Sequence, residues 1–151
     1  MSVFSKEYGG LTQAVVTDCV IFPENQKNTT DTPQYFHTDK AMWDTGATNT
    51  IITPKIIKQL KLKPFAEGGV TGVGGDVEGG VYKINIGLPG GQVVCNITAY
   101  ESELEYDILI GMDIILLGDF CLTNKDGKSV FSFRIPSQEH ILLNDLRSKN
   151  N

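Results

Sequence analysis

Hydrophobic residues in this chain occur in short runs that are separated by glycine, proline and polar residues. Runs of this length, rich in Val and Ile, are more typical of strands than of helices. We expect strands over residues 11–22, 34–43, 65–73, 77–88, 93–100, 106–110, 121–124 and 128–133. Roughly eight or nine short strands joined by glycine-rich turns predict an all-β fold, either a closed barrel or a closed sandwich.

Helix signals are few. Thr53 and Pro54 are residue types preferred at the N-cap and at the first position of a helix, and the apolar residues after them predict a short helix that ends near Lys61. Asp113 is suited to cap a second short helix over residues 114–118.

The later part of the chain carries turn and loop signals. Asp126-Gly127, between two predicted strands, favours a tight hairpin. Residues 24–33 are polar and predict an exposed loop, and the tail after Pro136 carries only a weak helix signal, over residues 141–146.

Length and composition limit the classes of function. The 151 residues suffice for one domain, so we expect a single domain over residues 1–151 with its core at about 11–135 and a C-terminal tail at 136–151. A net charge of −5 argues against nucleic-acid binding, which needs clustered Lys and Arg to neutralise phosphates. We expect no membrane association either, because no apolar run is long enough to cross a bilayer and residues 1–7 lack the features of a signal peptide.

The cysteines and histidines indicate neither a disulfide framework nor a metal site. Cys19, Cys95 and Cys121 are widely spaced among apolar neighbours, which predicts buried, reduced thiols and a cytoplasmic location. His37 and His140 are far apart, and no Cys/His pair has the spacing of metal ligands, so we expect no metal and no other cofactor.

The apolar pattern breaks most sharply within residues 41–52, where a run of strand type stops at Asp44 and apolar residues resume at Ile51. Asp-Thr-Gly alone is usually an ordinary turn, because Asp and Gly are favoured in turns. Here it places a carboxylate at the end of a buried strand, on a loop where Gly46 leaves the backbone unobstructed. A carboxylate in that position is suited to catalysis.

Two further elements follow this loop in a specific order. A Gly-rich segment occupies residues 71–80, and an apolar strand over residues 106–110 ends at Gly111. Together the three elements resemble the catalytic loop, the flap and the glycine-ended strand of the retropepsin-like aspartic proteases. The resemblance covers roughly residues 11–135 and implies a closed β-barrel of the retropepsin or acid-protease half-domain type, with one or two short helices. The Gly-rich segment fits a phosphate-binding loop poorly, because it lacks the Gly-Lys-Ser/Thr ending.

The resemblance also implies roles for the residues of the Asp44 loop. Asp44 would be the catalytic residue. Thr45 would hydrogen-bond across a two-fold axis, so that two such loops lock together. Gly46 would offer its backbone to the carboxylates and the substrate, and Ala47 would lie beside the substrate.

The flap and the downstream glycine receive roles in the same way. Val73, Gly74 and Gly75 would fold over an extended peptide and bind it through strand-like hydrogen bonds. Gly111 would pack under the catalytic loop, where any side chain would collide.

A single chain contains only half of such a site. Two neighbouring carboxylates that share one proton can activate water and polarise a carbonyl together, a rule that comes from the aspartic proteases themselves. Only one Asp-Thr-Gly occurs in the sequence, so a second chain must supply the other carboxylate. We therefore expect a homodimeric aspartic endopeptidase that hydrolyses a peptide or protein substrate and works on the acid side of neutrality.

Some features depart from the family or leave alternatives open. Viral members usually carry Arg after the downstream glycine, whereas Met112-Asp113 is closer to cellular and bacterial retropepsin-like domains, including the DNA-damage-inducible type. The sequence does not indicate which strands form the dimer interface. One alternative is a catalytically silent domain that dimerises or binds peptides. A phosphoryl-accepting loop of the P-type ATPase kind fits poorly, because its Lys is missing and the chain is too short.

The remaining residues of interest have structural explanations. We expect Trp43 to pack in the core or at its rim, and Asp107 and Asp113 to serve in turns and helix caps rather than as a second catalytic acid. His37 and His140 are expected on the surface.

Overall fold

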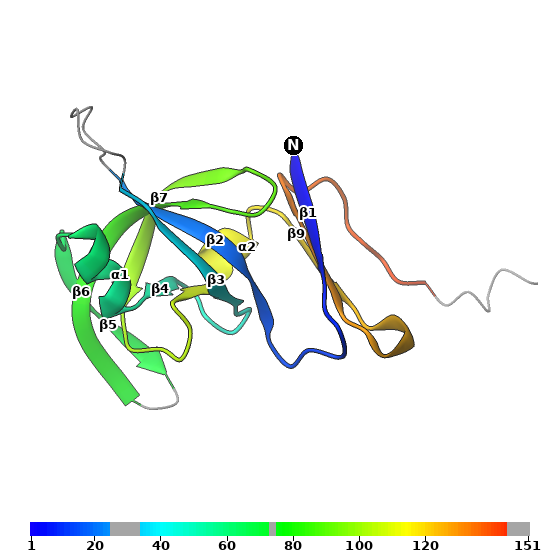
Figure 1. Ribbon diagram of the computed structural model, residues 1–151, viewed down its shortest axis with the longest axis horizontal. Coiled ribbons are helices and arrows are strands. Elements are labelled where there is room, and N and C mark those ends of the chain that lie inside the picture. The colour runs from blue at the N-terminus through cyan, green and yellow to red at the C-terminus, as the bar shows by residue number, and fades with distance from the viewer. Residues whose placement is uncertain (25–33, 73–74, 145–151) are drawn as a thin grey trace, which may run out of the picture.

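The computed structural model describes residues 1–24, 34–72 and 75–144. Within these residues the chain forms ten strands, two short α-helices and one 3-10 turn. The strands belong to a seven-stranded sheet and a separate three-stranded sheet. In Figure 1 the larger sheet occupies the left and centre of the molecule, and the smaller one lies on the right.

The larger sheet closes into a barrel. Its strand order is β2-β3-β8-β4-β7-β6-β5, and β2 also pairs with β6, so six strands form a ring and β5 is attached to its outside. The sheet is mixed, because β3–β8 and β4–β7 are parallel pairs whereas the others are antiparallel. The bounds are β2 Val15–Pro23, β3 Phe36–Trp43, β4 Thr50–Ile52, β5 Ala66–Gly72, β6 Gly75–Gly87, β7 Val93–Glu101 and β8 Ile108–Ile110. The predicted closed all-β barrel is thus confirmed.

The smaller sheet contains a strand that the sequence did not predict. Its order is β1-β10-β9, with bounds β1 Ser2–Glu7, β10 Val130–Ile135 and β9 Asp119–Thr123. The first predicted strand begins at residue 11, and residues 2–7 contain only two apolar residues, Val3 and Phe4. The backbone of β1 pairs with the whole length of β10, a partner more than a hundred residues away, which no local pattern could reveal.

An aromatic cluster joins the two sheets. The ring of Trp43, at the end of β3, lies 4.8 Å from that of Phe133 and 5.1 Å from that of Phe131. Its indole nitrogen donates a hydrogen bond of 2.9 Å to the buried Thr17 hydroxyl. Burial of large aromatic rings is strongly stabilising, and it fixes the strand that leads to Asp44. The prediction that Trp43 packs in the core is confirmed, since only 5% of its surface is exposed.

The helices lie close to where they were expected. Helix α1 runs over Pro54–Leu60 with Thr53 at its N-cap and Lys61, at φ 51°, at its C-cap. The Thr53 hydroxyl does not cap the helix, however, but donates to the Asp107 carbonyl oxygen.

Helix α2 runs over Met112–Ile115, so it begins two residues before the predicted position. Its N-cap is Gly111, and Asp113 is therefore not the capping residue. The Asp113 carboxylate instead turns towards the neighbouring strand β4, where it accepts hydrogen bonds from Thr50.

A hairpin forms around Asp126-Gly127, as predicted, but its turn is not tight: Thr123 pairs with Val130, so residues 124–129 make up the loop. Both residues have positive φ, 53° and 71°, within the 3-10 turn Lys125–Gly127 that joins β9 to β10. The tail differs from expectation, because residues 141–144 are not helical. The rest of the predicted helix and most of the polar loop at 24–33 lie outside the described residues. His37 and His140 are exposed, as expected.

The cysteines are free but not all buried. Cys19 is buried, and the burial, together with the nearby charges of Asp18 and Asp107, raises the pKa of its thiol to about 12. Cys121 is half-buried, and Cys95 is exposed on β7, which corrects the prediction of three buried thiols. Cys95 lies on the outward face of its strand, where an apolar neighbour in sequence does not mean an apolar neighbour in space. The cytoplasmic location stays a prediction.

Candidate active site

Asp44 lies at the end of the parallel strand pair β3–β8 of the barrel. Strand β3 runs parallel to β8, with Trp43 opposite Ile110 in the register. The Asp44 backbone N–H continues this ladder with a hydrogen bond of 2.9 Å to the Ile110 carbonyl oxygen. Asp44 is therefore the last residue fixed by the strand and the first of the loop. Its neighbour Trp43 is buried, whereas Asp44 itself is partly exposed.

The loop folds back on the Asp44 carboxylate. Gly46 N–H donates a hydrogen bond of 2.8 Å to Asp44 Oδ1, and Ala47 N–H donates one of 3.2 Å to the Asp44 carbonyl oxygen. A Cβ atom at Gly46 would lie 3.1 Å from Asp44 Oδ1, so the glycine leaves room for the carboxylate. Thr45 and Gly46 are exposed at the turn, and Ala47 is half-buried. The turn thus orients the carboxylate and leaves it open to solvent.

Gly111 lies directly beneath this loop. A Cβ atom at this position would be only 2.6 Å from the backbone carbon and oxygen of Asn49 and 3.0 Å from the Ala47 carbonyl oxygen. The φ of Gly111 is −93°, which any residue can adopt. The close approach of two backbones, and not an unusual conformation, therefore requires glycine here.

The backbone after Gly111 also binds the loop. Met112 N–H donates a hydrogen bond of 2.8 Å to the Ala47 carbonyl oxygen, and Asp113 N–H donates one of 3.1 Å to that of Thr48. These bonds attach the second half of the loop to the start of α2. The strand–glycine–helix segment is therefore the support on which the loop rests.

A cleft of about 560 Å³ lies between the loop and the β5–β6 hairpin. Asp44, Gly46 and Ala47 line it on one side, and Gly69, Val70 and Thr71 of β5 line it on the other. Its remaining walls are Thr48, Asn49, Ile51, Tyr100 and Leu109. The hairpin reaches beyond the barrel at the lower left of Figure 1. The arrangement provides one carboxylate at the wall of an open cleft, with a strand across from it.

The predicted flap corresponds to the β5–β6 hairpin. The two strands pair in antiparallel register from Ala66 opposite Val81 to Gly72 opposite Gly75, which confirms the hairpin. Val73 and Gly74, assigned to substrate binding, lie outside the described residues, and Gly75 begins β6.

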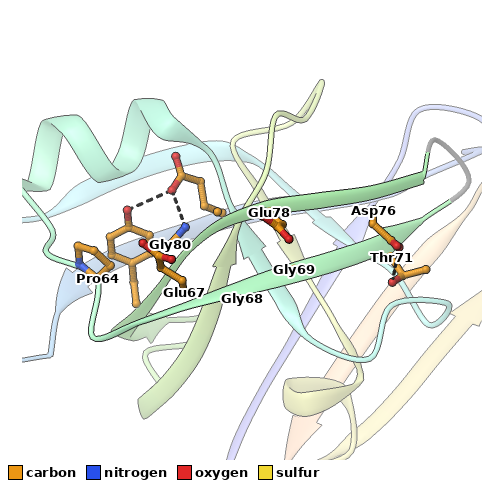
Figure 2. A pocket seen from close by; sticks show the side chains of 11 residues that line it. Pro64, Glu67, Gly68, Gly69, Thr71, Asp76, Glu78 and Gly80 are labelled. Carbon is orange, nitrogen blue, oxygen red and sulfur yellow. Dashed lines mark hydrogen bonds between the residues drawn. The ribbon is translucent and has the colours of Figure 1, made fainter.

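A larger hollow, of about 810 Å³, lies elsewhere on the hairpin (Figure 2). It contains no residue of the Asp44 loop, and four carboxylates line it: Glu67, Asp76, Glu78 and Glu101. Glu101 accepts hydrogen bonds from the Tyr82 hydroxyl at 3.1 Å and from the Gly80 N–H at 3.0 Å, and dashed lines in Figure 2 mark such bonds. Near the hairpin tip the Thr71 hydroxyl is 2.8 Å from Asp76. The larger hollow is not the candidate active site, because of these two hollows only the smaller cleft is lined by Asp44.

Several residues of the cleft were not predicted from the sequence. Ile51 and Tyr100 lie opposite one another in the parallel β4–β7 pair, and Leu109 is opposite Ile51 on β8. Each is an ordinary strand residue in the sequence, and only the strand order brings it to Asp44. In the part of the chain that the structure describes, no group of three or more acidic, Cys or His side chains could bind a metal ion. No described helix has the length and apolarity needed to cross a membrane.

Comparisons with known proteins found a family model, a curated relative and a solved structure that this chain resembles. A family model described as "gag-polyprotein putative aspartyl protease" matches residues 37–116. DNA damage-inducible protein 1 from Candida glabrata is 30% identical over 91 residues, which are 57% of this chain and 21% of that protein. The chain thus spans about a fifth of the length of this curated relative. Among solved structures, a retropepsin-like aspartic protease from Rickettsia conorii matches with a TM-score of 0.43 and 14% identity, covering 88% of this chain and 95% of that one.

Proposed function

This chain belongs to the retropepsin-like aspartyl protease family, and we propose that two copies of it form an aspartic endopeptidase with Asp44 from each copy. The observation that carries the proposal is the position of Asp44. Its carboxylate is held by the Gly46 N–H, is partly exposed, and lines a cleft beneath a strand of the hairpin. Because the sequence contains one Asp-Thr-Gly, the second carboxylate comes from a second copy.

The two carboxylates divide the chemistry between them. Two carboxyl groups in close contact cannot both ionise, because their negative charges would repel, so the pair retains one proton. The ionised Asp44 takes a proton from water as the water oxygen bonds to the carbonyl carbon, while the protonated Asp44 gives its proton to the carbonyl oxygen. The C–N bond of the resulting diol breaks when the nitrogen receives a proton from the dyad and a diol hydroxyl returns one to it.

Other residues of the site serve the substrate and the second copy. An extended peptide would lie between the loop and β5, with its backbone paired to the hairpin as an added strand. Exposed Thr45 is free to approach its counterpart across the two-fold axis, and Ala47 is small enough to lie beside the peptide. Closure of the hairpin over the peptide would exclude bulk water from the dyad.

The test combines cleavage with molecular mass. The wild-type protein is incubated with a peptide library at pH 4 to 7, with and without pepstatin, and its mass is measured by sedimentation equilibrium. We expect a dimer, cleavage that pepstatin inhibits, and loss of cleavage in Asp44→Asn with fold and dimer intact. Asp39→Asn is the matched control, because Asp39 is an exposed aspartate on the same strand, and it should cleave like the wild type.

Cleavage by Asp44→Asn at the wild-type rate would refute the assignment of the catalytic residue. A dimer that binds library peptides but cuts none of them would replace the endopeptidase with the silent peptide-binding alternative. A monomer that cleaves would exclude the shared dyad.

A further inference from the structure

Thr50, at the start of β4, is fully buried, yet it carries two hydrogen-bond donors that need acceptors. Both are met by one side chain from a distant part of the sequence. The Thr50 backbone N–H donates to Asp113 Oδ2 at 3.0 Å, and its hydroxyl donates to Asp113 Oδ1 at 2.9 Å. Asp113 Oδ1 also accepts the Ile114 N–H at 3.0 Å.

This pair lies within the support of the catalytic loop. The Thr50 hydroxyl is 3.4 Å from the Gly111 N–H, from which it accepts a hydrogen bond. The adjoining backbone bonds run from Met112 N–H to the Ala47 carbonyl and from Asp113 N–H to that of Thr48. The Asp113 side chain therefore fixes the end of the loop whose other end carries Asp44.

We propose that Asp113 is a positioning residue for the reaction: through Thr50, its carboxylate sets the geometry in which the loop presents Asp44. The inference rests on the proposed function for its consequence in catalysis, but the coupling between Asp113 and the loop can be measured without any substrate. Asp113 does not line the cleft, so it acts through the backbone of residues 47–50.

The role requires both oxygens of the carboxylate as hydrogen-bond acceptors. Asn at position 113 has one oxygen, so its amide NH₂ would face either the Thr50 N–H or the Thr50 hydroxyl. Facing the N–H places two donors against each other. If the NH₂ faces the hydroxyl, the Thr50 hydroxyl oxygen would accept from both the amide and the Gly111 N–H, and the hydroxyl hydrogen would lose the acceptor that Asp113 Oδ1 provides. One buried donor is left without an acceptor in either orientation, and the loop must shift to relieve it.

The chain contains a matched control. At the other end of β8, the buried Thr38 hydroxyl donates to Asp107 Oδ2 at 2.7 Å and accepts the Lys40 N–H at 2.9 Å. Thr38 and Asp107 line no part of the cleft. Substitutions at this pair remove the same kind of hydrogen bond near the opposite end of β8, without touching the loop.

The experiment compares Asp113→Asn and Thr50→Val with Asp107→Asn and Thr38→Val, in the full-length protein at equal concentration. The first measurement is amide hydrogen exchange of Ala47 and Met112, read by NMR. We expect both amides to exchange at least about 10-fold faster in Asp113→Asn and Thr50→Val and at the wild-type rate in the control pair.

The second measurement is kcat and KM on a fluorogenic peptide taken from the library digest. We expect kcat to fall on the order of 10- to 100-fold in Asp113→Asn, with KM changed by less than about 3-fold, because the loss is one of orientation. Thr50→Ser retains the hydroxyl, so its kcat should stay within about 3-fold of the wild-type value.

Wild-type exchange at Ala47 and Met112 in Asp113→Asn would overturn the proposal, and so would a kcat that falls equally in Asp107→Asn. If Asp113→Asn does not fold, Thr50→Val, which preserves the shape of the side chain, decides the matter by the same two measurements. If the wild type cleaves nothing, the proposed function fails, whereas faster exchange in Thr50→Val with unchanged exchange in Thr38→Val still supports the positioning of the loop.

Discussion

Near each end of strand β8, a buried threonine from a neighbouring strand is paired with an aspartate, and the two pairs have different surroundings. At the start of the strand, Asp107 accepts a hydrogen bond from Thr38 and one of 2.9 Å from Lys55 on helix α1. Just beyond its end, Asp113 binds Thr50 through both oxygens, and among the described residues it forms no ion pair. The same chemistry therefore joins an outer helix to the barrel at one end and supports the candidate catalytic loop at the other.

The backbone hydrogen bonds around Asp107 and Asp113 also differ. The Asp107 carbonyl oxygen accepts from the N–H of Thr53 and from its hydroxyl, and Asp107 N–H donates to the Lys40 carbonyl, so this end joins already regular elements. The backbone beside Asp113 instead contacts the loop at residues 47–48, which is not part of a regular strand ladder. Loss of the Thr38–Asp107 pair should therefore lower stability, whereas loss of the Thr50–Asp113 pair should also distort the candidate site.

The largest effect is expected at the loop end of β8, in Gly111→Ala. The added Cβ would press on the Asn49 backbone at 2.6 Å, which cannot rotate away as a side chain can. We expect a loss of about 2–3 kcal/mol in unfolding free energy and a fall in kcat on the order of 100-fold. Urea unfolding and peptide cleavage measure the two quantities. Gly10→Ala, where nothing lies within 4 Å of the added Cβ, should match the wild type; equal behaviour of the two variants would contradict the close packing.

A smaller effect is expected from Asp107→Asn, and it should depend on pH. Burial acts to raise the pKa of Asp107, but hydrogen bonds from Thr38 and Lys55 and the charges of Lys55 and Lys40 outweigh it, so the pKa lies below its ordinary value of 3.8. A depressed folded-state pKa stabilises the protein above the unfolded pKa, and this contribution is lost as the pH falls through the folded value.

We therefore expect Asp107→Asn to lower the unfolding free energy by about 1–2 kcal/mol at pH 7, with kcat within about 2-fold of the wild type. The stability difference should shrink as the pH falls below about 4. Urea unfolding at pH 7, 5 and 3.5 and at fixed protein concentration measures it. A stability difference that grows as the pH falls would contradict the lowered pKa of Asp107.

The smallest effect is expected from Lys55→Met, which removes the ion pair with Asp107 but retains the apolar stem of the side chain. The Lys55 side chain is 61% exposed, so solvent screens the pair. We expect a loss of about 0.5 kcal/mol or less, measured by the same unfolding experiment, and no change in kcat. A loss as large as that of Asp107→Asn would mean that the ion pair, and not the Thr38 hydrogen bond, dominates at this end.

Local signals in the sequence predicted much of the fold and the centre of the site. The apolar run that stops at Asp44, the Thr53-Pro54 helix start and the Asp126-Gly127 turn all depend on residues close in the chain, and the structure has a strand, a helix and a turn at these places. Strand β1 and the exposure of Cys95 were not predictable in this way. Each depends on which face or partner a segment meets after folding.

Local sequence preferences are enough to place an aspartate after a buried strand, on a glycine-containing turn, because steric preferences act between neighbouring residues. The position of β8 between β3 and β4, and the contact of Thr50 with a carboxylate 63 residues further along the chain, follow from the folded barrel alone. Contacts at that separation arise from the closure of the barrel, in which buried donors must find acceptors wherever the strands bring them.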